Sequence, residues 1–169
     1  MLAESAARHY FKVLAYKDEY EVARLHIDGS FSAWLAGLFD RTGQKVFHMA
    51  PPLLTRRDAR TGRRNKIALR GFWVEPLLRV LRHGKALRRT LLDPFGRQRD
   101  RVIGRALIRE FEEDVRLAIE RLTPATLDAA VALLNVPAST RGFGVVKARQ
   151  YEAARPVRER HRARLAERV

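Results

Sequence analysis

The chain of 169 residues contains no cysteine. Without thiols it cannot form disulfides, use a catalytic thiolate or ligate an iron–sulfur cluster through cysteine. A reducing cytoplasm fits this composition, so we expect a cytoplasmic protein. No apolar run approaches the roughly 20 residues that a membrane-spanning helix needs. The first residues, Met1–Ser5, have neither the basic nor the apolar region of a signal peptide. The sequence therefore predicts no membrane partner.

The patterns that mark common catalytic and cofactor sites are also missing. The five histidines are scattered, and none has the two-histidine spacing of a zinc protease. No serine stands within Gly-x-Ser-x-Gly. Gly142–Gly144 begins like a dinucleotide fingerprint, but the third glycine is missing and a proline-containing loop, not a strand, precedes it. We therefore expect no catalytic, cofactor-binding or metal-ligating residue in this chain.

Asp93–Gly96, with the sequence Asp-Pro-Phe-Gly, is a turn signal. It differs from the metal-binding motif of protein kinases because the inserted proline changes both the spacing and the backbone. We expect Asp93 to cap this turn and Phe95 to fill part of the core.

Acidic residues are few by comparison with basic ones. The chain has 34 Lys and Arg against 19 Asp and Glu, a net charge of +15, and 46% of its residues are hydrophobic. This composition describes a soluble globular protein, not a disordered one. A field of this strength attracts nucleic acid, anionic lipid or an acidic protein surface.

The strongest basic cluster is the segment Thr55–Asn65, which has five arginines around Gly62. Guanidinium groups bind phosphates and carboxylates bidentately, so these side chains are candidates for contacts with an anionic partner. Few aromatic residues lie among them, which weakens binding of single strands by base stacking. A solvated loop is the simpler interpretation, and a nucleic-acid partner is the less favoured one. The candidates are Arg56, Arg57, Arg63 and Arg64.

Apolar residues recur at helical spacing through most of the chain. The expected helices are Ser5–His26, Ser30–Phe39, Phe72–Arg88, a long helix with an apolar stripe from Ile103 to Leu122, Thr123–Leu134 with Thr123 as the N-cap, and Val145–Arg168. The Ser30–Phe39 helix is rich in aromatic and leucine residues, so we expect it to be largely buried. Pro156 is expected to kink or interrupt the last helix.

Two short segments, Lys45–Met49 and Lys66–Arg70, predict the strands of a long-looped hairpin. The sequence thus predicts an α+β, mainly helical fold, with about five to six helices packed around one core and a small antiparallel β-hairpin. No linker divides the chain, so a single domain over residues 1–169 is expected.

Two further groups of residues are candidates for contacts. Asp18 lies on an otherwise apolar face, where a carboxylate is costly unless it is paired or hydrogen-bonded. We expect Asp18 to be buried against a basic or donor group; the alternative places Asp18 and Glu19 in an interface to other domains. Arg141 and Lys147 flank Gly142–Gly144 at a helix start, where backbone amides can hold an anion, although a structural turn is favoured.

Four stretches of the chain, in this order, resemble the C-terminal region of the indolepyruvate ferredoxin oxidoreductase family. They are Ala15–Leu25 (AYKDEYEVARL), Ala50–Leu54 (APPLL), Leu92–Gly96 (LDPFG) and Arg141–Lys147 (RGFGVVK). The resemblance implies an enzyme that converts aryl pyruvates, chiefly indolepyruvate, to acyl-CoA with thiamine diphosphate, iron–sulfur clusters and ferredoxin. This chain has no Gly-Asp-Gly signature for thiamine diphosphate and no cysteine ligands.

The resemblance therefore implies an accessory, non-catalytic domain at the C-terminus of a larger oxidoreductase polypeptide, either a fragment or a separately expressed piece. Thiamine diphosphate and the iron–sulfur clusters are expected elsewhere in the full enzyme, and none in this chain. Its expected partners are the catalytic domains of the same enzyme and ferredoxin, whose acidic surface would be attracted to the arginines. A homo-oligomer is also possible from the sequence. The alternatives are an independent basic nucleic-acid-binding module and a ferredoxin-docking module.

Overall fold

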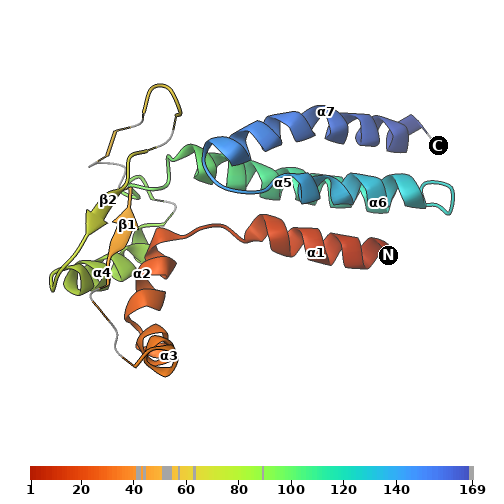
Figure 1. Ribbon diagram of the computed structural model, residues 1–169. Helices are drawn as coiled ribbons and strands as arrows, with labels where there is room; N and C mark the ends of the chain where they lie inside the picture. The colour runs from red at the N-terminus through yellow and green to blue at the C-terminus, as the bar shows by residue number, and fades with distance from the viewer. Residues whose placement is uncertain are drawn as a thin grey trace. The chain divides into compact units, whose positions relative to one another are not determined.

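The computed structural model describes residues 1–40, 43, 45–50, 55, 56, 58–62, 64–88 and 90–167 (Figure 1). These residues form seven α-helices, two 3-10 turns and one pair of short strands. The fold is α+β and mainly helical, as the sequence predicts. No helix in the described ranges is both long enough and apolar enough to cross a membrane.

The chain divides into two compact units, which we name by their main feature. The bundle unit comprises Met1–Tyr16 and Gln98–Val169, and the hairpin unit comprises Lys17–Arg97. Each unit has its own hydrophobic cluster, where the sequence predicts one core. Two compact units do not decide the number of domains, so the single domain stays a prediction.

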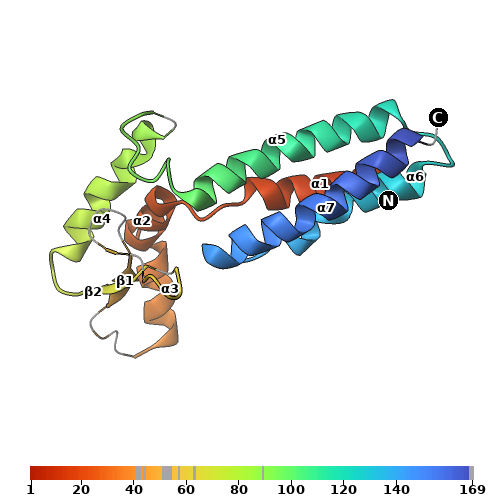
Figure 2. The ribbon, with the colours of Figure 1, turned by 90° about the horizontal axis from the view of Figure 1, so that it is seen from above.

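The bundle unit consists of four helices that run side by side (Figures 1 and 2). They are α1 (Leu2–Leu14), α5 (Arg99–Glu120), α6 (Leu127–Asn135) and α7 (Val145–Glu167), with the 3-10 turn η2 (Val136–Ser139) after α6. Helix α5 buries Ile103, Phe111 and Ala118, which belong to the apolar stripe predicted for it. Each large apolar side chain buried in this way contributes about 1.5–3 kcal/mol. Phe111 and Ala118 belong to one hydrophobic cluster, whose other buried members are Val13, Ala130, Leu133, Leu134 and Leu165.

Helix α1 is tied to the end of α6 by polar contacts. Lys12 Nζ donates to the carbonyl oxygens of Pro137 and Ala138, each at 2.7 Å. The last carbonyls of a helix lack partners within it and carry partial negative charge. Lys12 on α1 therefore caps the η2 turn, which directly follows α6.

A second polar contact between α1 and α6 centres on Asn135. Its Oδ1 lies 2.7 Å from Ser5 Oγ and 2.9 Å from His9 Nε2. Both Ser5 and His9 are buried. Burial disfavours the charged imidazolium and lowers the pKa of His9 below its ordinary value of 6.5, although the hydrogen bond with Asn135 acts in the opposite direction.

The buried His9 predicts that the protein loses stability on mild acidification. Because the folded-state pKa is below 6.5, the unfolded chain binds the proton more readily, and the contribution of neutral His9 is present above pH 6.5 and lost as the pH falls below it. The free energy of unfolding, measured by urea denaturation at pH 7.5 and 5.5, should fall less with pH in His9→Gln than in the unmodified chain.

The unmodified chain, measured at the same two pH values, is the reference. An equal pH dependence in the His9→Gln chain would show that burial of His9 does not contribute to it.

The hairpin unit contains three helices, a 3-10 turn and the two strands. They are α2 (Glu19–Ile27), α3 (Ser30–Leu38), β1 (Phe47–Met49), β2 (Ile67–Leu69), α4 (Val74–His83) and η1 (Gly84–Leu87). The strands are antiparallel, with Phe47 opposite Leu69 and Met49 opposite Ile67, which confirms the predicted hairpin. Its core is small: Ala23, Val74 and Leu78 are buried, and half-buried apolar residues surround them.

The first expected helix, Ser5–His26, is wrong, because the chain leaves the helical conformation between Leu14 and Glu19. Asp18 is the reason. Its side chain accepts a hydrogen bond from the backbone N–H of Tyr20 at 3.1 Å and so starts a new helix as an N-cap. The apolar spacing continues across the break, so the sequence pattern does not reveal where one helix ends and the next begins. The number of helices is therefore higher than expected.

The prediction that Ser30–Phe39 is largely buried is also wrong. Trp34, Leu38 and Phe39 are 59%, 57% and 58% exposed, and no residue of α3 is fully buried. Helix α3 packs mainly against α2. The core of the hairpin unit is too small to cover its aromatic residues.

Two smaller expectations about helix ends differ from the structure. Helix α6 begins at Leu127 with Thr126 as its N-cap, because Thr123 and Thr126 hydrogen-bond reciprocally and form a turn first. Helix α7 is not interrupted at Pro156. Its buried residues Ala148 and Leu165 lie on either side of the proline, so packing holds both halves in one helix.

Candidate interaction sites

Asp18 is buried and paired, as the sequence predicts. Its Oδ1 accepts the N–H of Tyr20, and its Oδ2 forms an ion pair with Arg88, which directly follows η1. This pair ties the start of α2 to the end of the α4–η1 segment. Glu19, the first residue of α2, is half-buried. An interface role for Asp18 and Glu19 stays a prediction.

The Asp-Pro-Phe-Gly turn lies against the same helix. Tyr20 Oη donates to Asp93 Oδ1 at 2.8 Å, and the N–H of Phe95 donates to the same oxygen at 3.0 Å. Asp93 thus caps the turn, and the buried Phe95 meets the Tyr20 ring edge-on at 5.3 Å, as expected. Gly84 completes the cluster, since a Cβ there would lie 2.5 Å from the Tyr20 ring. Two of the four family-like motifs therefore hold the hairpin unit together.

The candidate anion site at the start of α7 already contains a carboxylate. Gly144 N–H donates to Asp100 Oδ2 at 2.7 Å, and Gly142 and Gly144 adopt φ values of 77° and 62° that favour glycine. Burial lowers the pKa of Lys147, and the charge of Asp100 partly offsets this effect. Arg141 is exposed, and its Nε donates to the backbone of the preceding turn. The geometry agrees with a structural turn, and an external anion would compete with Asp100.

The arginine-rich loop is only partly described. Two of its candidates lie outside the described residues: Arg57 and Arg63. Arg56 is exposed, and Arg64 Nη1 donates to the carbonyl oxygen of Thr55 at 2.5 Å. Asp58 Oδ1 accepts hydrogen bonds from the backbone and hydroxyl of Thr61, at 2.7 and 3.0 Å, and so stabilises the turn of the loop.

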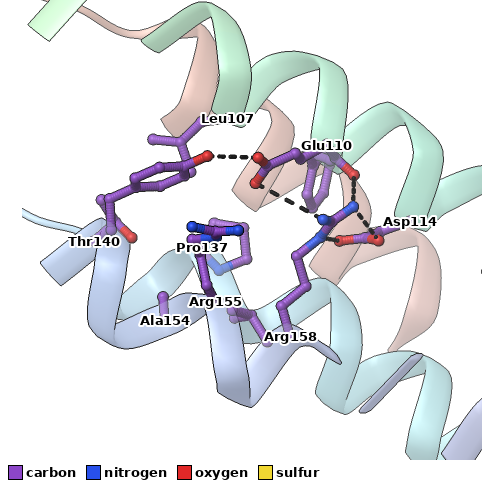
Figure 3. A pocket seen from close by; sticks show the side chains of 11 residues that line it. Leu107, Glu110, Asp114, Pro137, Thr140, Ala154, Arg155 and Arg158 are labelled. Atoms are coloured by element: carbon purple, nitrogen blue, oxygen red, sulfur yellow. Dashed lines mark hydrogen bonds and ion pairs between the residues drawn. The ribbon is translucent and has the colours of Figure 1, made fainter. Parts of the chain in front are cut away.

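The most buried ion pair of the bundle unit was not among the predicted candidates (Figure 3). Asp114 on α5 accepts hydrogen bonds from Arg158 on α7, with Nε–Oδ2 at 2.7 Å and Nη2–Oδ1 at 2.8 Å. Arg162 pairs with the same carboxylate. Asp114 follows Phe111 by three residues and precedes Ala118 by four, so it occupies a core-facing position of the helical stripe. A carboxylate at a core-facing position of an apolar stripe is the sequence signal that predicts such a buried ion pair.

Neighbouring polar groups extend this cluster along α5 and α7. Tyr151 Oη donates to Glu110 Oε1 at 2.5 Å; burial, together with this bond, raises the pKa of Tyr151 to about 12. The cavity beside these side chains has a volume of about 20 Å³, and Thr140 is one of its lining residues. The Oγ1 atom of Thr140 is buried and has no hydrogen-bond partner among the described residues. A cavity of this size holds about one water molecule, so it cannot admit a metabolite.

The hairpin unit exposes more large apolar side chains than it buries. Among its described residues, twelve are exposed and five apolar residues are buried. The exposed ones are Leu25, Trp34, Leu38, Phe39, Val46, Phe72, Trp73, Leu77, Val80, Leu87, Leu91 and Leu92.

An open groove between α2 and α3 contains part of this apolar surface. Its lining consists of Val22, Leu25, His26, Ser30, Phe31 and Trp34, and its volume is about 540 Å³. Phe31 and Trp34 stack with their ring centroids 6.0 Å apart. The ring of His26 meets both Phe31 and Phe47 edge-on at 5.0 Å. These ring contacts form the groove without any partner present.

Comparison with known proteins places the chain in a family. A family model matches residues 1–160, which include parts of both units. The chain belongs to the family of unknown function DUF6537. No curated protein and no solved structure matches it. Membership of this family names no activity, so the indolepyruvate ferredoxin oxidoreductase resemblance stays a prediction.

Removing the carboxylate of Asp114 should destabilise the bundle unit. Asp114→Asn leaves Arg158 and Arg162 without their shared negative partner, and breaking a buried ion pair costs about 3–5 kcal/mol. Because Arg162 is about one-third exposed, we expect a loss of roughly 2–4 kcal/mol in the free energy of unfolding, measured by urea denaturation.

Glu113→Gln is the matched control. Glu113 lies 3.5 Å from the same arginine, but its side chain is 45% exposed, so its loss should cost less than about 1 kcal/mol. Similar losses in the two variants would contradict the assignment of Asp114 as the central partner.

Proposed function

We propose that this chain is an accessory, non-catalytic interaction domain of an enzyme that resembles the indolepyruvate ferredoxin oxidoreductases, which oxidatively decarboxylate aryl pyruvates to acyl-CoA. The observation that supports the interaction role most directly is the exposed apolar surface of the hairpin unit. Soluble monomers rarely expose large contiguous apolar surface, and such surface marks interaction sites.

The number of exposed apolar side chains favours a protein partner. Covering a fully exposed Leu or Phe side chain contributes about 1.5–3 kcal/mol. Trp34, Phe72 and Leu91 are each more than half exposed, and they come from three different segments of the hairpin unit. The catalytic domains of the same enzyme are the partner that the resemblance implies.

The charged clusters support a structural role for the motifs. Asp18, Asp93 and Asp114 each accept hydrogen bonds from donors within the chain. Two of them, Asp18 and Asp93, belong to motifs that carry the family resemblance. Motif residues that hold a unit together fit an accessory domain better than a catalytic one. In this proposal thiamine diphosphate and the iron–sulfur clusters are bound by other domains, in the cytoplasm.

The proposal predicts that the 169-residue chain alone does not turn over indolepyruvate with coenzyme A and an artificial electron acceptor. It also predicts that the chain forms a complex with the separately expressed catalytic region of such an enzyme, because covering the apolar surface is favourable. Turnover is followed by reduction of the acceptor, and complex formation by sedimentation velocity.

Each arm has a clear opposing result. Turnover by the pure chain would contradict the accessory role. Sedimentation of the two polypeptides as separate species at micromolar concentration would contradict the interaction role. Since many inactive proteins would pass the first arm, the complex is the decisive measurement.

A further inference from the structure

The groove between α2 and α3 continues into an apolar ridge on α3. Phe31, Trp34 and Leu38 are spaced by three and four residues, so they lie on one side of this helix. At 1.5 Å per residue the ridge extends about 10 Å. An amphipathic helix presents apolar side chains at matching intervals when it binds to a groove. The spacing of these side chains therefore matches the apolar face of a bound helix.

The lining of the groove is uncharged at neutral pH. Its apolar members surround Ser30 and His26, and burial together with the nearby Lys45 lowers the pKa of His26. The Nδ1 atom of His26 is buried and has no hydrogen-bond partner among the described residues. The lining thus suits apolar side chains of a partner.

The charge at the border of the groove is positive. Lys45 Nζ lies 6.0 Å from the centroid of the Phe31 ring and donates to Ser32 Oγ at 2.8 Å. No described carboxylate pairs with Lys45. Asp28, next to Ser30, is already paired with Arg24 at 3.2 Å. A carboxylate on the partner would therefore find Lys45 available.

The charge of the whole unit points to the same kind of partner. Residues 17–97 contain 17 Lys and Arg and 8 Asp and Glu, a net charge of +9. At least six of these carboxylates have partners within the unit: Asp18, Glu21, Asp28, Asp58, Glu75 and Asp93. An acidic surface is attracted to this excess, whereas a second copy of the chain is repelled by it.

We propose that the groove between α2 and α3 binds an amphipathic helix of a partner protein, with large apolar side chains seated along Leu25, Phe31 and Trp34 and a carboxylate paired with Lys45. The inference rests on the proposed interaction role and specifies its site and the chemistry of the partner. The basic surface then selects acidic helices, and the apolar groove supplies most of the affinity.

Tryptophan fluorescence of the full chain tests this proposal. The sequence has two tryptophans, so Trp73→Phe leaves Trp34 as the only reporter. The probes are three synthetic helical peptides with the same leucines at positions 1, 4, 5 and 8 of the apolar face, flanked by Glu, Gln or Lys. The Glu peptide should shift Trp34 emission to shorter wavelength in a saturable way and bind at least about tenfold more tightly than the Lys peptide.

Variants measured with a dye-labelled Glu peptide, by anisotropy, locate the site. Leu25→Ala and Trp34→Ala should each weaken binding at least about tenfold. Phe72→Ala is the matched control: Phe72 is 93% exposed in the same unit but does not line the groove, so its removal should change affinity less than about twofold. Lys45→Gln should reduce the ratio of the affinities for the Glu and Gln peptides. Its affinity for the Gln peptide should change little.

Several results would overturn the proposal. The Lys and Glu peptides could bind equally well, or Phe72→Ala could weaken binding as much as Trp34→Ala does. The Trp34 emission could shift with protein concentration in the absence of peptide, which would indicate self-association. Random duplex DNA could displace the labelled peptide with equal affinity.

A binding measurement with the catalytic region of the enzyme separates this proposal from the proposed function. If that region binds the unmodified and Trp34→Ala chains equally, the groove is not the binding site, while the accessory role is supported. If the Glu peptide binds and the catalytic region does not, the groove proposal is supported and the accessory role is contradicted.

Discussion

The ion pair between a buried aspartate and an arginine is the interaction on which both units depend. Asp114 joins α5 to α7 through Arg158 and Arg162, and Asp18 joins the start of α2 to Arg88. In a chain with 34 basic and 19 acidic residues, carboxylates are the scarce partner. Each of these carboxylates neutralises an arginine inside its unit. The net charge of +15, which the composition sets, remains and attracts anionic surfaces.

The two units differ in how completely they bury their apolar residues. The bundle unit has helices of 22 and 23 residues, α5 and α7, and surrounds Phe111 and Leu165 on several sides. The hairpin unit has helices of at most ten residues and strands of three, and such short elements enclose little volume. Its aromatic helix α3 stays exposed as a result. This exposed surface follows from the shortness of the elements.

Long regular elements could be predicted from the sequence, and features that depend on three-dimensional partners could not. The α5 stripe follows from apolar spacing, because one face of this helix is buried, and the two strands follow from their short β-type segments, whose register was not predicted. The break before Glu19 depends on whether the Asp18 side chain bonds to a backbone amide, which apolar spacing does not encode. The exposure of Trp34 depends on how much core the rest of the unit provides. Asp114 was missed because the neighbouring Val115 fits the same stripe.

The residues that resemble a known enzyme family and the residues that we assign to the groove form two different sets. Tyr20, Asp93 and Phe95 carry the resemblance, and they satisfy one another within the hairpin unit. Trp34 and Lys45 lie outside the four motifs, and the fold leaves the apolar face of one and the charge of the other available. A contact that is complete inside the chain contributes stability but cannot recognise anything else. In the proposed interaction, recognition therefore depends on the second set, because its exposed apolar face and positive charge match an apolar partner that carries carboxylates at its edge.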